Sequence, residues 1–278
     1  MAGPSSQQLL PGGKVSAGRS FFLVKDVIFM PLCLGWYFAL AAFTEQPSAP
    51  PPATQTPVAV LVLQGALAAV ALAVLVQHLI LTPPDPDEHE LWGVMSYIGR
   101  WIFLTRHCLA LQAIHLVLSL IAGMAGSSRL LQLTQGVAVF IGAMGWFVTI
   151  QFFLLVFRHP EFQRRCQQLV ARGRNLRLGA TVNHAPAIVL AILDVGLAKD
   201  HASLRVDCSL SKSLLLSVMY AAFYIALLVL NNNATGYWPY PFMKEFTVLK
   251  WIVFFFTQIG ILAAFCVAEW GVSRLPVP

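Results

Sequence analysis

The sequence predicts an all-α fold, a polytopic membrane helix bundle of about seven (six to seven) transmembrane helices. Hydrophobic residues make up 58% of the chain and charged residues 11%, whereas a soluble domain has roughly 25% charged residues. A soluble core has no room for that much apolar surface, so lipid must solvate most of it. The apolar residues also gather in runs, and each run is long enough for a transmembrane helix, which needs about 20 residues. The formal charge of +6 therefore belongs to loops and sets topology, and we expect no nucleic-acid partner.

The seven apolar runs lie at residues 20–43, 58–81, 98–123, 136–157, 178–198, 213–230 and 247–273. A stretch with five prolines separates the first two runs and is expected to form a stiff connector, because proline cannot continue a helix. The run at 58–81 gives the weakest signal. These boundaries divide the chain into a flexible tail at 1–19, an N-terminal extension with two membrane helices and the proline linker at 20–96, and a membrane bundle at 97–273.

The basic residues predict the orientation of the bundle. With seven spans, the N-terminus and the loops after spans two, four and six share one side. That side, with its helix-start residues, holds thirteen of the 18 lysines and arginines, and the other side holds five: Arg129, Lys199, Arg205, Lys212 and Arg274. The positive-inside rule then places the N-terminus in the cytosol, or in the matrix or stroma if the membrane is an organellar inner membrane. The first 25 residues are basic and lack acids, as in a presequence, but their prolines and glycines favour a flexible tail.

The fourth loop, from Arg158 to Arg177, holds six arginines and is expected to contain a short helix along the membrane surface. Its apolar face is predicted to consist of Phe162, Cys166, Leu169 and Val170. Three arginines are predicted to lie off that face: Arg164, Arg165 and Arg172.

Polar residues inside the predicted spans are candidates for function, because burying them in lipid is expensive. A glutamine or histidine in a span usually makes an interhelical hydrogen bond, and this is our interpretation of His115. Asp194 and Glu269 lie near span ends, where water or a neighbour such as Lys199 is expected to satisfy them. Thr105 differs, because it and the pair Asn183-His184 are both predicted to lie roughly 10 Å below the membrane surface on the positive side.

Two short motifs stand out in the sequence, and the first of them contains Thr105. The first comprises Tyr97, Gly99, Trp101, Phe103, Leu104, Thr105, Gln112 and Ala113, and the second comprises Thr235, Gly236, Trp238, Tyr240, Pro241 and Phe242. Over residues 97–270 these motifs, with Glu269, resemble the androgen-induced family of multi-pass membrane proteins. That family hydrolyses fatty-acid esters of hydroxy fatty acids with a threonine nucleophile and a histidine partner. The resemblance implies that Thr105 is the nucleophile.

The chain departs from the family pattern in span five. The family has Asn-His-x-x-His-Thr, with the second histidine catalytic, whereas this chain reads Asn183-His184-Ala185-Pro186-Ala187. A threonine hydroxyl without an adjacent base is a poor nucleophile. His184 is the candidate substitute, offset by about 4.5 Å along the helix axis from the usual position. A kink at Pro186 is one way to bring it into reach of Thr105.

Two hypotheses follow. In the first, the chain is a catalytically impaired member that binds lipid or serves as an accessory subunit of a membrane complex. In the second, it is a membrane-embedded threonine hydrolase of lipid esters. The candidate catalytic residues are Thr105 and His184, and the candidate substrate-binding residues are Trp101, Gln112, Asn183, Trp238 and Tyr240. Membrane lipids are the expected partners, and other subunits of a membrane complex are further candidates.

Other classes of function are less consistent with the sequence. The five cysteines form no CxxC pair, so spacing predicts neither a metal site nor a disulfide framework, and no cofactor is implied. A retinal-type Schiff base is disfavoured because Lys250 stands at the start of the last span. A transporter is disfavoured because no internal repeat is visible. Asn233-Ala234-Thr235 fits a glycosylation acceptor but overlaps the second motif on the positive side, which favours coincidence.

Overall fold

The computed structural model describes residues 14–44, 56–77, 99–171, 173, 175–236 and 238–275. Within these residues every regular element is helical, so the predicted all-α fold is confirmed. The part of the predicted tail before residue 14, most of the proline linker and residues 78–98, which include Tyr97 of the first motif, lie outside the described residues.

Long helices coincide with all seven predicted apolar runs. They are α1 (Lys14–Thr44), α2 (Val58–Val76), α4 (Leu104–Ala125), α5 (Ser128–Gln151), α7 (Leu176–Leu193), α9 (Leu210–Thr235) and α10 (Val248–Val272). Among the described residues, six helices are long and apolar enough to cross a membrane, and α1 adds a shorter apolar stretch at Ile28–Phe43. The run at 58–81, which gave the weakest signal, contains one of the six. The chain is therefore an integral multi-pass membrane protein.

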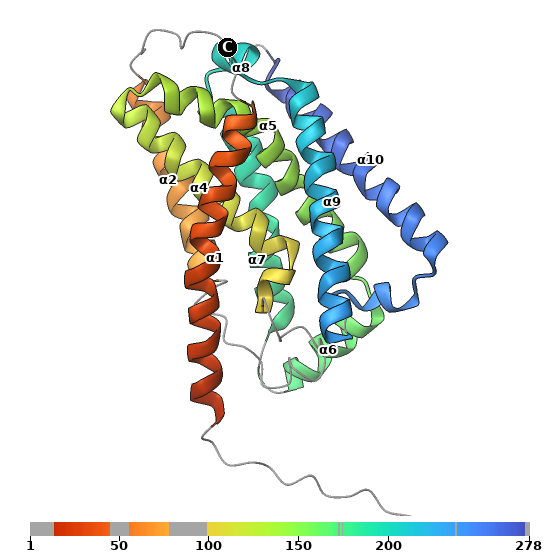
Figure 1. Ribbon diagram of the computed structural model, residues 1–278. Helices are drawn as coiled ribbons and strands as arrows, with labels where there is room; N and C mark the ends of the chain where they lie inside the picture. Colours follow the sequence, from red (N-terminus) through yellow and green to blue (C-terminus); the bar gives the residue numbers. More distant parts are fainter. Residues whose placement is uncertain are drawn as a thin grey trace, which may run out of the picture.

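Shorter helices connect the long ones. They are the 3₁₀-helix η2 (Gly99–Ile102), the π-helical turns η3 (Phe152–Val156) and η4 (Asp194–Ala198), α6 (Pro160–Ala171), α8 (His201–Asp207) and the 3₁₀-helix η5 (Pro241–Glu245). Figure 1 shows α6 and the connection between α9 and α10 at one end of the bundle, and α8 with the end of α10 at the other. The loops after α5 and α9 thus share an end, as seven spans require.

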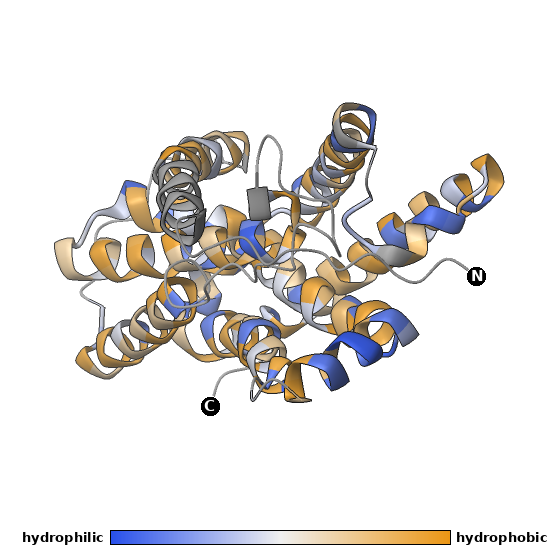
Figure 2. Ribbon diagram, turned by 90° about the horizontal axis from the view of Figure 1, so that it is seen from below, coloured by the Kyte–Doolittle hydropathy of each residue, from blue (hydrophilic) through white to orange (hydrophobic). Residues whose placement is uncertain are grey.

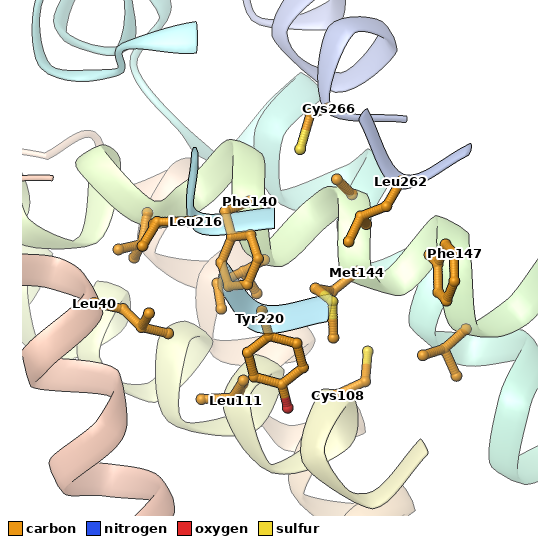
Figure 3. Packing of buried hydrophobic residues seen from close by; sticks show 14 of the residues in the cluster. Leu40, Cys108, Leu111, Phe140, Met144, Phe147, Leu216, Tyr220, Leu262 and Cys266 are labelled. Atoms are coloured by element: carbon orange, nitrogen blue, oxygen red, sulfur yellow. The ribbon is translucent and has the colours of Figure 1, made fainter. Parts of the chain in front are cut away.

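Helix α5 is the centre of the bundle and packs against α4, α7, α9 and α10. In the main core, Phe140 and Met144 of α5 gather with Tyr220 of α9 and Leu111 of α4 (Figure 3). By contrast, α10 leaves large apolar side chains such as Phe256 exposed. Hydrophobic residues dominate the long helices when the bundle is seen from its end (Figure 2). Lipid is the solvent for these outer faces.

Gly145 of α5 allows the close approach of α5 to α7. A Cβ atom there would lie 2.5 Å from the Ala187 carbonyl oxygen and 2.5 Å from Gln112 Nε2. We expect Gly145→Ala to lower the free energy of unfolding by about 1–3 kcal/mol, because the α7 backbone and the buried Gln112 side chain would have to move away from the added Cβ atom. Thermal unfolding in detergent measures this. Gly260→Ala is the matched control, since its Cβ would meet nothing within 4 Å. Equal stability of the two variants would contradict the packing.

The predicted helix in the arginine-rich loop exists as α6, but its buried face differs from the prediction. The structure buries Phe162, Arg165, Cys166 and Leu169, whereas Val170 is exposed. The physical reason is helical spacing: residues at i, i+3, i+4 and i+7 from Phe162 share one face, and Arg165 occupies the i+3 position. One arginine is therefore buried on the apolar side of α6, and Arg164 beside it is exposed.

Candidate active site

Thr105 is the second residue of α4, where Tyr224 of α9 completes the start of the helix. The N-cap residue Phe103 makes no side-chain capping bond. Instead, the Leu104 backbone N–H donates to the Tyr224 hydroxyl at 3.1 Å, and that hydroxyl donates to the Ile102 carbonyl at 2.9 Å. Free N–H groups at a helix start need such partners. Thr105 is thereby held at a fixed helix terminus, and the residue is 8% exposed.

The Thr105 hydroxyl contacts the His184 imidazole of α7. Thr105 Oγ1 lies 2.9 Å from His184 Nε2, and His184 Nδ1 lies 2.7 Å from the Ala180 carbonyl oxygen. A carbonyl only accepts, so Nδ1 carries the ring proton in the neutral imidazole. Nε2 is then unprotonated, and the Thr105 hydroxyl donates to it. This is the hydrogen-bond arrangement of a nucleophile and its general base.

Residues of α5 and η3 hold His184 in place. The Phe152 ring stacks on the imidazole with centroids 3.5 Å apart and planes 12° from parallel. Phe152 begins the π-helical turn, in which the Phe157 N–H donates to the Phe152 carbonyl at 2.8 Å. The Thr149 hydroxyl donates to the His184 carbonyl at 2.7 Å. His184 is thus held by the Phe152 ring on one face of its imidazole, by the Ala180 carbonyl at Nδ1 and by the Thr149 hydroxyl at its backbone carbonyl.

Ala187, at the position of the family's histidine, has a packing role. It is 1% exposed, and its carbonyl accepts a hydrogen bond from Gln112 Nε2 at 2.9 Å. Pro186 lies inside α7, one residue before it. The axial offset between positions 184 and 187 does not keep His184 from Thr105.

Thr105 and His184 face a largely apolar cavity of about 320 Å³. Asn183 and Tyr240 also line it, so the structure brings together four of the seven predicted site residues. Asn183 is 7% exposed, and its Oδ1 atom has no hydrogen bond in the described structure. Tyr240 lies 2.9 Å from the Tyr224 hydroxyl and donates to it, because Tyr224 gives its own proton to Ile102. Burial raises the pKa of the Tyr240 phenol, which keeps this donor protonated.

The other three predicted residues lie outside the cavity lining. Trp101 is 1% exposed and stacks on Phe29 with centroids 5.5 Å apart. Trp238 packs against Trp251 at 4.8 Å, and Gln112 bonds to α7 as described above. These contacts hold helices and loops together. Sequence reasoning did not single out Phe152 or Tyr224, which lie in apolar runs where aromatics are ordinary, and it placed Arg165 away from the apolar face.

A second polar cluster lies away from the cavity. His115 Nε2 is 2.9 Å from Asp194 Oδ2, and its Nδ1 is 2.9 Å from the Tyr37 hydroxyl, so His115 makes interhelical hydrogen bonds as expected. Lys199 Nζ lies 3.9 Å from Asp194 Oδ1, as expected. Asp194 is only 4% exposed and Glu269 is fully buried, with Trp146 donating to it at 2.8 Å. The expectation that water reaches these two acids was wrong, since packed helices enclose them.

The fold and the site define a class: an integral membrane helix bundle with a threonine–histidine pair facing an apolar cavity. A family model described as FAR-17a/AIG1-like protein matches residues 66–272, and the chain belongs to that family. The match begins within α2, upstream of the motifs that carry the resemblance. No curated protein and no solved structure matches the chain. The five cysteines are free, and the described residues contain no cluster of three or more side chains suited to a metal ion.

Proposed function

We propose that this protein is a membrane-embedded hydrolase of lipid esters, with Thr105 as nucleophile and His184 as general base. The observation that carries the proposal is the 2.9 Å contact between Thr105 Oγ1 and His184 Nε2 at the wall of the cavity. The resemblance to the androgen-induced family implies the same chemistry, with fatty-acid esters of hydroxy fatty acids as the substrate class. A largely apolar cavity suits the acyl chains of that class.

The reaction proceeds by two acyl transfers. The Thr105 oxygen attacks the ester carbonyl carbon while His184 Nε2 takes the hydroxyl proton. The ester C–O bond breaks, and the departing alcohol oxygen takes that proton from His184. Water then attacks the acyl-threonine and gives a proton to His184. The carboxylic acid leaves, and Thr105 recovers its proton from the imidazole.

Both tetrahedral intermediates carry a negative oxygen that needs donors. The start of α4 supplies partial positive charge beside Thr105. Asn183 supplies a side-chain amide that lines the cavity one residue before the base. We therefore assign Asn183 as a donor to the oxyanion.

Asn183→Ala is expected to lower kcat about 10²–10³-fold with a smaller change in KM, because the donor acts mainly in the transition state. Steady-state kinetics of the purified protein measures both constants. Asn183→Asp removes the donor at nearly constant size and serves as the shape control. A change in KM alone would make Asn183 a ground-state contact instead.

The direct test of the proposal is hydrolysis by the full-length protein in lipid nanodiscs. A palmitoyl ester of hydroxystearic acid is the substrate, and mass spectrometry follows release of both acids. Turnover that rises with protein concentration and disappears on heat denaturation supports the proposal. No turnover, together with co-migration in a large assembly in mild detergent, would favour the accessory-subunit hypothesis, which the alanine at position 187 motivates.

The orientation remains the one that the basic residues predict, with the N-terminus on the positive side. We propose that α6 and the α9–α10 connection, which share one end of the bundle in Figure 1, face that side. The site then opens toward the cytosol, matrix or stroma. Accessibility of single cysteines introduced in α6 to an impermeant reagent checks this.

A further inference from the structure

Arg165 is the charged residue among the described side chains that line the cavity. It lies on the buried face of α6 and is 6% exposed, while the neighbouring Arg164 is exposed. The remaining lining is apolar or uncharged, with His184 neutral when it accepts from Thr105. Among the described lining residues, the positive charge of the cavity therefore lies at its α6 wall.

The charge and the catalytic pair belong to different walls of one cavity. Phe162, Arg165 and Leu169 come from α6, at the end of the bundle, whereas Thr105 and His184 come from α4 and α7. Apolar side chains such as Val156 and Leu176 line the cavity too. This arrangement suits a ligand with an apolar body, a reactive carbonyl at one place and an anionic group at another.

We infer that Arg165 binds the anionic group of the substrate, and that this group is a free carboxylate. A guanidinium matches a carboxylate with two parallel hydrogen bonds, and such charged pairs are stronger away from water. The inference rests on the proposed function, and it assigns a residue that determines specificity. Anchoring the carboxylate at α6 orients the chain so that its ester carbonyl reaches Thr105. A lipid phosphate shares this chemistry and is distinguished below.

The test compares three esters that share one acyl chain: the free acid, its methyl ester and an ester with a phosphate head group. The wild type is expected to hydrolyse the free acid with kcat/KM at least about 10-fold above the methyl ester, the range of a charged hydrogen bond. Arg165→Gln is expected to remove this preference, and Arg165→Lys to keep part of it. Arg164→Gln, the matched control, keeps the preference in full. Faster cleavage of the phosphate ester than of the acid would make phosphate the ligand and overturn the carboxylate assignment.

A binding arm separates failure of this inference from failure of the proposed function. Non-hydrolysable ether analogues of the acid and of its methyl ester are added to Thr105→Ala protein, and thermal shift is measured. Tighter binding of the acid supports Arg165 as an anion site even if no ester is cleaved. Equal binding of the two analogues, or equal rates of wild type on the acid and the methyl ester, overturns the inference. The binding comparison and the wild-type rate comparison need no Arg165 variant, so misfolding of Arg165→Gln does not prevent the test.

Discussion

Thr105→Ala is expected to abolish ester hydrolysis, lowering kcat about 10⁴-fold or more, which is the scale of losing a nucleophile. The reason is that the Thr105 hydroxyl, which donates to His184 at the cavity wall, is the proposed nucleophile. Thr105→Ser keeps the hydroxyl and should keep measurable turnover. Thr105→Val keeps the shape without the hydroxyl and should be as inactive as alanine. Release of hydroxy fatty acid, followed by mass spectrometry, measures all three.

Stability is the control for these variants. In the described structure the Thr105 hydroxyl hydrogen-bonds to His184, so the free energy of unfolding of Thr105→Val in detergent should lie within about 1 kcal/mol of wild type. Turnover by Thr105→Val comparable to wild type would remove threonine from the mechanism. The hydrolysis would then have another source.

His184→Gln is expected to lower kcat about 10²–10⁴-fold, the usual contribution of a positioned general base. Glutamine keeps a hydrogen bond to Thr105 but does not take its proton. The double variant with Thr105→Ala should be no slower than Thr105→Ala alone, because the two residues act as a unit. Kinetics of the two single variants and the double variant form the measurement.

Chemical rescue provides the control for the base. In His184→Ala, removal of the imidazole leaves the Phe152 ring without its stacking partner, and added imidazole has a place to bind. Partial recovery of turnover with imidazole identifies the lost group as a base. Full activity of His184→Gln would show that His184 only packs against Phe152.

The helices of this protein were predictable because their signals are local. Length and composition predict a membrane helix whatever it packs against. Even the run at 58–81, which gave the weakest signal, contains a helix, Val58–Val76, that is long and apolar enough to cross a membrane. Three of the four cavity-lining site residues, Thr105, Asn183 and His184, were also predictable, since lipid makes a polar residue in a span conspicuous. Tyr240 came from the second motif.

The support of the site was not predictable, because it depends on which helices meet. Phe152 and Tyr224 are aromatics in apolar runs, and nothing local marks one as stacking on a base and the other as completing a helix start. Arg165 was placed on the wrong face because the apolar stripe was drawn through Val170, one position too far around the helix. Trp101 carries a motif signal but packs on Phe29, which only the fold reveals.

Covalent labelling of Thr105 tests the central claim most directly. The purified protein is treated with a fluorophosphonate probe, digested, and the peptide that contains residues 104–106 is sequenced by mass spectrometry. The account predicts an adduct on Thr105 in the wild type, a much weaker one in His184→Gln and none in Thr105→Val. An unmodified Thr105 in protein that hydrolyses the ester, or an adduct on another residue that persists in Thr105→Val, would contradict it.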